Sequence, residues 1–440
     1  MHLRSLTAFF VTALLASVPA VAAPWTAAQA VDTALQNHPD AALARARVQA
    51  AEAMIEQARA AWMPQVSVSG RYTQTDRPMQ AFGSILNQRA FNPGLDFNRP
   101  GQIDNLNLTG TVGYNLYAGG RATAGRKAAE AGARAAAQDL RVAHQQLATE
   151  AIKALLNLRK AREAVGAIES SVHAYAAALA NARLRFDAGQ VLKADLLSLE
   201  VLHAQTREQL THARHGAALA ERAFLFVLGR APTPGESVEL AGADPVLDAL
   251  TAPATTDVTA RPELTGLQER VAAAEKMIDV ARGSRRPNVN AFASYQNDRG
   301  WKLDRHGNSW LAGLAVEVNL FDGGQTSGKI HQAEAELAQV KQMLRKAELG
   351  LALEADQARL AHTAALERLT VSAQTVAHAE ESATLSRARF EQGALLASDL
   401  IAVESRLLDA RLRRTLAEAD ERIALAELHR AVGLTPLASN

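Results

Sequence analysis

The stretch "LNLTGTVGYNL", residues 106–116, alternates apolar and polar side chains along its length. Because neighbouring side chains of a β-strand point to opposite faces, its even-numbered residues share one apolar face and its odd-numbered residues one polar face. The stretch also has the length of a transmembrane strand, which needs ~9–11 residues. Apolar outward and polar inward is the pattern of a strand in a membrane barrel, so the sequence predicts such a strand here.

Three further stretches show the same alternation. Residues 310–320, "WLAGLAVEVNL", repeat it most fully, and shorter versions cover residues 66–72 and 289–295. Aromatic residues near the expected strand ends suit the girdle at a membrane surface; they are Tyr72, Tyr114, Tyr117, Tyr295 and Trp310. An ordinary soluble sheet with one wet face shows the same alternation, and four strands taken alone would favour that alternative.

Two observations favour the membrane. The stretches between the strands are helical and far too long to cover so small a sheet. Four strands also cannot close a barrel, which takes about eight at least. Copies of the chain must therefore combine if the strands lie in a bilayer, because a bilayer tolerates no open sheet edge. The sequence predicts a homo-oligomeric barrel.

The chain carries two copies of a long pattern. "RLRFDAGQVLKADLLSLE" begins at residue 183 and "RARFEQGALLASDLIAVE" at residue 387, so 387 − 183 = 204 positions separate them. Further matches join residues 39–72 to 262–295 and "NLYAGG" (115–120) to "NLFDGG" (319–324). The pattern indicates an internal tandem repeat, in which each half runs helix, strand, loop, strand, very long helix, tight turn, long helix. We expect a first repeat at 23–229, a linker at 230–261, a second repeat at 262–433 and a C-terminal tail at 434–440.

The helical stretches are unusually long. From about residue 122 to 188 there is no proline, and leucine and alanine recur at the spacings of a coiled coil. Roughly 65 residues at 1.5 Å each make a rod on the order of 100 Å long. Such a rod cannot fold as a compact domain, so we expect it to pack sideways against other rods.

The repeated motif marks the point where each long helix reverses. Gly189 and Gly393 stand at the reversal, because glycine tolerates the left-handed conformation that caps a helix. Asp195 and Asp399 then fall in the first turn of the returning helix, where exposed N–H groups favour a carboxylate. Capping alone would explain both aspartates, and a functional role is the alternative. The two tips should lie at the far end of the rod from the strands.

The N-terminus has the features of a secretory signal peptide, residues 1–22. Arg4 precedes an apolar run from Leu6 to Val18, and Ala20-Val21-Ala22 fits a cleavage site that leaves Ala23 as the first mature residue. The run is shorter than the ~20 residues of a spanning helix. The chain has no cysteine, so it has neither a disulfide nor an acceptor for an N-terminal lipid.

The two RxRFxxGxxxxxDLxxxE turns, the paired strand ends, the repeat and the signal peptide together resemble the TolC family of outer-membrane efflux proteins, the outer membrane factors. The resemblance implies an α+β membrane protein: a homotrimer with four strands per chain in a twelve-stranded transmembrane β-barrel, continued by a long periplasmic α-helical barrel of coiled-coil hairpins. Residues 230–261 would be its equatorial linker. It would be a passive exit duct for efflux or type I secretion, set in outer-membrane lipid, with a periplasmic adaptor (a membrane fusion protein) and an inner-membrane pump as partners.

The same resemblance assigns roles to the hairpin tips. The periplasmic entrance or gate would involve Asp195, Asp399, Phe186 and Phe390, and the adaptor would dock at Gly189, Leu192, Gly393 and Leu396. In the best-known member of the family, a Tyr and an Arg beside the second glycine help to hold the entrance closed, and two Asp residues line it. The corresponding positions here are Phe390, Leu395, Asp399 and Ala402, of which Asp399 alone is retained. We therefore expect apolar contacts to replace the polar lock.

Other functions find little support in the sequence. The net charge of +1 offers no field for nucleic acid. His212 and His215 lack a third metal ligand, no nucleophile–base arrangement is evident, and no cofactor or metal is expected, so we predict a channel rather than an enzyme. A soluble periplasmic coiled-coil adaptor or scaffold is the alternative. The exported cargo stays open. The long first loop, about Thr73 to Asn105, shows no clear periodicity and is expected outside the cell.

Overall fold

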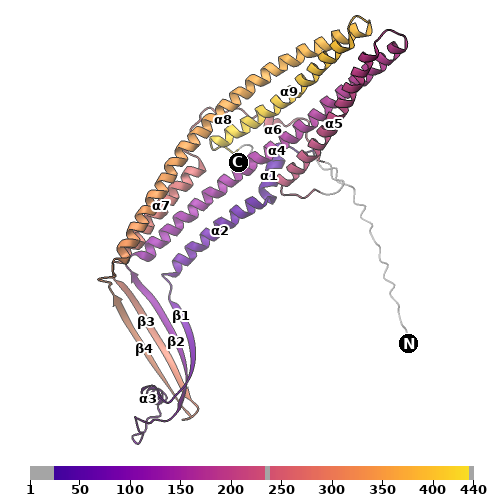
Figure 1. Ribbon diagram of the computed structural model, residues 1–440. Coiled ribbons are helices and arrows are strands. Elements are labelled where there is room, and N and C mark those ends of the chain that lie inside the picture. Colours follow the sequence, from indigo (N-terminus) through magenta and orange to yellow (C-terminus); the bar gives the residue numbers. More distant parts are fainter. Residues whose placement is uncertain (1–23, 233–237, 436–440) are drawn as a thin grey trace, which may run out of the picture.

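The computed structural model describes residues 24–232 and 238–435. The expected signal peptide, its cleavage point before Ala23 and the last five residues of the tail lie outside these ranges. The described residues form an elongated molecule with a sheet at one end and two helical hairpins reaching to the other (Figure 1). Within them, no helix combines the length and the apolar character required to cross a membrane.

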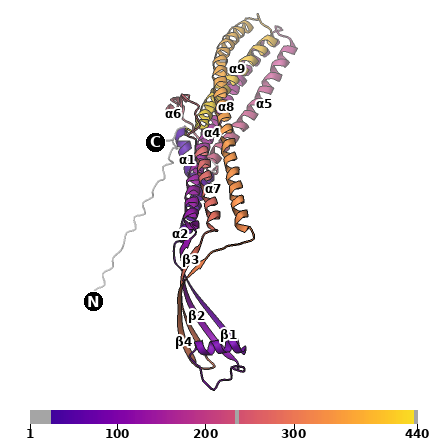
Figure 2. The same cartoon turned by 90° about the vertical axis from the view of Figure 1, so that its left-hand side faces the viewer.

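The sheet has four antiparallel strands in sequence order: β1 (Gln65–Thr75), β2 (Ile103–Ala118), β3 (Asn288–Gly300) and β4 (Arg305–Glu317). Figure 2 shows them continuing below the helices. All four expected strands are confirmed, but β4 ends at Glu317 rather than at Leu320. Glu317 pairs with Asn288, and the residue before Asn288 is Pro287, which has no N–H to extend the ladder.

The strand register gathers the apolar residues on one side of the sheet. Val66 pairs with Val112, and Tyr295 pairs with Trp310, so these side chains share what we call the apolar face. That face is open to its surroundings, and Trp310 is 77% exposed. The opposite, polar face carries serine, threonine and asparagine side chains. A large apolar surface without a cover is unusual for a soluble protein and normal for one that faces lipid.

The helices form two antiparallel hairpins and a set of shorter partners. The bounds are α1 (Ala27–Asn37), α2 (Pro39–Ala60), α4 (Arg121–Asp187), α5 (Lys193–Val227), α6 (Pro245–Asp248), α7 (Pro262–Gly283), α8 (Gln325–Glu391) and α9 (Ala397–Ala431). The two longest, α4 and α8, have 67 residues each. Each begins after a glycine with a positive φ, Gly120 at 84° and Gly324 at 88°, where the chain bends sharply out of the strand.

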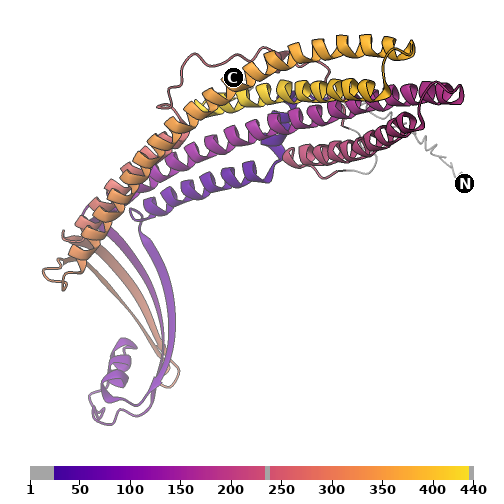
Figure 3. The same cartoon turned by 45° about the horizontal axis from the view of Figure 1, so that its top comes forward.

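The helices lie side by side in a curved layer (Figure 3). In the half next to the strands, α4 packs between α2 and α7, and α7 packs on α8; in the half next to the tips, α4 packs between α5 and α9, and α9 packs on α8. The layer therefore has one side formed by α2 and α5 and another formed by α8. The sheet below it ends on the same two sides, with β1 and β4.

The main core lies where these two halves of the rod meet. Side chains of α1, α4, α5 and α6, including Val31, Ile152, Phe224 and Leu247, are buried together there. Beside them, the fully buried Arg261 donates to Glu354 at 2.9 Å and to the Ala431 carbonyl at 3.0 Å.

Burial opposes the charge of Arg261. The hydrogen bonds and charges of Glu263 and Glu354 outweigh that effect and raise its pKa. Arg261 thus ties the start of α7 to α8 and to the end of α9.

The long connection expected from about Thr73 to Asn105 is present, but it contains a helix that the sequence analysis did not predict. β1 continues to Thr75, β2 begins at Ile103, and the connection contains a ten-residue helix, α3 (Pro78–Asn87). Pro78 sits in its first turn, where a missing N–H costs nothing. Ala81 and Ile85, one turn apart, are buried with Ile103. So short a helix shows too few turns for its period to stand out.

Candidate functional site

Both hairpins reverse through the same backbone geometry. At the first tip, Gly189 has φ 73° and its N–H bonds the Phe186 carbonyl at 2.9 Å, while the Gln190 N–H bonds the Arg185 carbonyl at 2.8 Å. The second tip repeats the pair of bonds around Gly393, whose φ is 78°. This is the Schellman ending of a helix, which places glycine in the left-handed conformation. The predicted capping role of the two glycines is confirmed.

The residues after each glycine start the returning helix. Leu192 and Leu396 occupy the N-cap positions, and their side chains are 72% and 64% exposed. Asp195 and Asp399 follow in the first turn, as expected. Asp195 is half-buried and Asp399 is exposed. Among the described residues neither carboxylate forms a hydrogen bond or ion pair, so what stabilises both is the field of the helix N-terminus.

The two tips pack against each other through a small apolar cluster. Phe390, which is only 3% exposed, lies in it with Leu179, Ala182, Leu199, Ala397 and Leu400, and these residues come from α4, α5, α8 and α9. Phe186 is half-buried and lies outside the cluster. The structure therefore separates the two phenylalanines that the repeat makes equivalent. Phe390 joins the hairpins within one chain, whereas Phe186 keeps a partly open ring.

Arg185 is a second link between the tips, and the sequence reasoning missed it. Its Nη1 donates to the Phe390 carbonyl at 2.6 Å, and its guanidinium lies 5.8 Å from the centre of the Phe390 ring. A Cβ on Gly393 would meet its Nη2 at 2.7 Å. The signal that could have revealed it is the repeated RxRF motif. An arginine that occurs in both turns, close to a capping glycine, indicates a contact with a specific partner.

Each hairpin is also closed by an arginine–glutamate pair at the same place in the repeat. Arg183 reaches Glu200 at 2.8 Å, and the Arg387 Nη2 reaches the Glu404 Oε2 at 2.8 Å. The second pair is the more buried, with Glu404 only 6% exposed. The hydrogen bond that Arg387 donates to the Glu404 carboxylate is the main cause that raises the pKa of Arg387. Burial is the main cause that raises the pKa of Tyr175. The Glu404 charge also raises this pKa, and the Arg387 charge lowers it.

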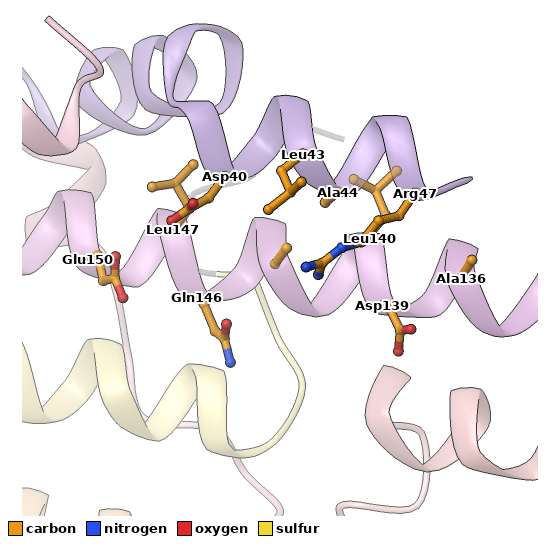
Figure 4. A pocket seen from close by; sticks show the side chains of 11 residues that line it. Asp40, Leu43, Ala44, Arg47, Ala136, Asp139, Leu140, Gln146, Leu147 and Glu150 are labelled. Atoms are coloured by element: carbon orange, nitrogen blue, oxygen red, sulfur yellow. The ribbon is translucent and has the colours of Figure 1, made fainter. Parts of the chain in front are cut away.

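A pocket of about 230 Å³ lies between α2 and α4, away from the tips (Figure 4). It mixes apolar side chains such as Leu43 and Leu147 with Arg47, Asp139 and Glu150. Asp139 is held by Arg270 of α7 at 2.5 Å. Nothing in this set forms a nucleophile with its base, and no cluster of metal ligands occurs in the described residues. We interpret the pocket as a gap between packed helices.

A sheet with one open apolar face, two helical hairpins and two polar tips define the class of an outer-membrane channel. The sequence model of the outer membrane efflux protein family matches residues 30–230 and 259–434, and the chain belongs to that family. It is 26% identical to Protein CyaE of Bordetella pertussis over 431 residues, which cover 92% of this chain and 83% of the relative.

Solved channels share the fold. CusC superposes with a TM-score of 0.79 at 16% identity over 94% of this chain and 93% of CusC. VceC of Vibrio cholerae gives 0.79 at 19% identity over 92% and 96%. The protein therefore lies in the outer membrane and extends into the periplasm. Family and fold are those of channel proteins for efflux or secretion rather than of a soluble adaptor.

Proposed function

We propose that three copies of this chain assemble into one continuous channel and serve as the passive exit duct of a tripartite efflux or type I secretion system. The observation that carries the proposal is the pair of open sides. The outer edges of β1 and β4 have no partner strand among the described residues, and the face between them is apolar and exposed. An open edge in a bilayer leaves backbone groups without hydrogen bonds, so β1 of one copy must pair with β4 of the next.

The helices support the same closure. The side formed by α2 and α5 stands above β1, and the side formed by α8 stands above β4. A contact between two different surfaces of the same chain is head-to-tail, and it closes into a ring when the rotation fits. Three copies give twelve strands, and at ~4.8 Å per strand with a tilt of ~40° their barrel has a backbone radius of about 12 Å. The tandem repeat gives each copy two hairpins, so six tips surround the entrance.

We propose that the tips form the periplasmic entrance and the docking surface. Three copies each of Asp195 and Asp399 would gather near the axis, where like charges repel and attract cations. Closure would then come from apolar contacts of Phe186 and from the Phe390 cluster that joins the hairpins. The outward parts of the tips, with the exposed Leu192 and Leu396 beside Gly189 and Gly393, would receive a periplasmic adaptor that connects to an inner-membrane pump.

The assembly is tested by mass and by conductance. The mature protein in mild detergent should have three times the mass of one chain, show a heat-dependent shift on electrophoresis, and form channels in planar bilayers. A stable monomer that needs no detergent would refute the proposed function.

Docking is tested by substituting Gly393 with valine. The substitution strains a residue at φ 78° and pushes a methyl group against Arg185. Cross-linking to the adaptor should fall, while Gly350→Val, inside α8 with no neighbour within 4 Å of its Cβ position, should leave it unchanged. Equal cross-linking by both variants would exclude the tip as the docking surface.

A further inference from the structure

The connection between β1 and β2 holds a helix against the polar face of the sheet. Ala81 and Ile85 of α3 are buried with Ile103, whose side chain lies on the polar face at the sheet end far from the helical hairpins. The end of α3 comes closer still. A Cβ on Gly307 would lie 2.0 Å from the Asn87 carbonyl, and one on Gly300 would lie 2.1 Å from the Gln88 side chain. Two strand residues without side chains thus make a seat for α3.

A buried polar cluster holds α3 in this seat. Gln88 is fully buried and donates to the Asp104 carbonyl at 2.7 Å and to the Asn105 side chain at 3.0 Å. Asn105 in turn donates to Asp298 at 2.5 Å, and Asn107 donates to the same carboxylate at 2.9 Å. Moving α3 away from the sheet would break these hydrogen bonds and leave buried polar groups without partners, so the cluster opposes such a movement.

We propose that α3 is a fixed collar at the outer mouth of the pore and sets the size of what can leave. This inference rests on the proposed function, because the polar face encloses the pore only when the barrel is closed. The outer end of this barrel is the end far from the periplasmic helices. With a backbone radius of about 12 Å, three helices each ~10 Å across occupy much of the rim. Met79 and Leu86, 84% and 46% exposed, lie on the side of α3 turned from the sheet and present apolar surface to the opening.

The collar is tested by polymer exclusion from one side. Graded polyethylene glycols are added to the extracellular side of single channels in planar bilayers, and the largest polymer that lowers the conductance measures the outer mouth. The chain has no cysteine, so Thr256→Cys, exposed in the connection between α6 and α7, takes a biotin label that marks the periplasmic side. Gly307→Val should displace α3 and raise the cut-off by at least one polymer step. Gly113→Val, on the polar face with no atom within 4 Å of its Cβ position, should keep the wild-type cut-off.

A second variant keeps the fold intact. Met79→Cys changes an exposed side chain, and a bulky maleimide on it should lower the cut-off and the conductance of an otherwise normal channel. Complete labelling with no change in either would overturn the collar. Faster trypsin cleavage after Arg89, just beyond α3, would show that Gly307→Val has displaced the helix. An unshifted cut-off in this displaced variant would also overturn the collar. A preparation that forms no channel would overturn the proposed function and the collar with it, whereas normal channels with unshifted cut-offs overturn the collar alone.

Discussion

Phe390→Ala should open the periplasmic entrance. The ring is 3% exposed and packs against residues of three other helices, α4, α5 and α9, so its removal deletes the centre of the contact between the two hairpins. Truncating a buried phenylalanine costs about 3–5 kcal/mol. Arg185 loses a cation–π contact worth about 0.5–1 kcal/mol at a partly exposed site. Because the backbone bond to the residue 390 carbonyl survives, the expected loss falls on side-chain packing.

The chain supplies its own control. Phe186 holds the equivalent place in the first hairpin but is half-buried and lies outside the cluster. Phe186→Ala should therefore cost less than Phe390→Ala, since the loss scales with the apolar area that was buried. If hairpin packing keeps the entrance narrow, single-channel conductance should rise in the order wild type, Phe186→Ala, Phe390→Ala.

The recordings need a stability measurement beside them. Thermal unfolding of the helical signal, followed by circular dichroism in the same detergent, shows whether each variant has lost packing at the tips. A Phe390→Ala channel that is clearly destabilised and yet conducts like the wild type would refute the argument, because the cluster would then be structural without holding the entrance.

Three further outcomes are expected. Asp399→Asn should lower the cation preference of the channel, measured as the reversal potential in a salt gradient, because it removes an exposed carboxylate from the proposed entrance. An unchanged potential would mean that the residue only caps its helix. Val68→Arg on the apolar face should block assembly in the outer membrane, at about 2–4 kcal/mol for a charge near the bilayer centre, while the adjacent Ser69→Arg on the polar face should assemble. Burial, followed by the nearby Glu418 carboxylate, raises the pKa of Glu163, so the folded state binds its proton more tightly than the unfolded state. The protein therefore loses stability as pH rises from the unfolded pKa of this carboxyl to its raised folded pKa. Glu163→Gln should accordingly raise the Tm at pH 7. The variant should lose this advantage at acidic pH, where the wild-type glutamate is protonated and the side chain at position 163 is neutral in both proteins.

The sequence was most informative where a local pattern decides the structure. Alternation over 106–116 predicts β2, and the repeated glycines predict the turns, because both depend on residues close in the chain. α3 was missed for a physical reason of the opposite kind. A helix of ten residues is marginal by itself and owes its stability to Ile103 and to the seat on Gly300 and Gly307, which strand pairing alone brings together.

The tips show the same limit more sharply. The motif predicts equal environments for Phe186 and Phe390, and the structure gives them different ones. Arg185 and the Phe390 carbonyl are 205 positions apart, and their contact depends on how one hairpin leans on the other. No periodicity within either hairpin contains that information.

The position of each hairpin in the layer explains why two equal motifs came to differ. α9 has α4 on one side and α8 on the other, so Glu404 and the nearby Phe390 are covered within one chain. α5 has α4 on one side and stands at the open side of the layer, so Glu200 stays partly exposed. In a closed ring the neighbouring copy's α8 would lie against that open side. The more exposed motif is thus the one that a second copy would cover. The duplicated turn joins the hairpins within a chain at one tip and, in the proposed ring, would contact the neighbouring copy at the other.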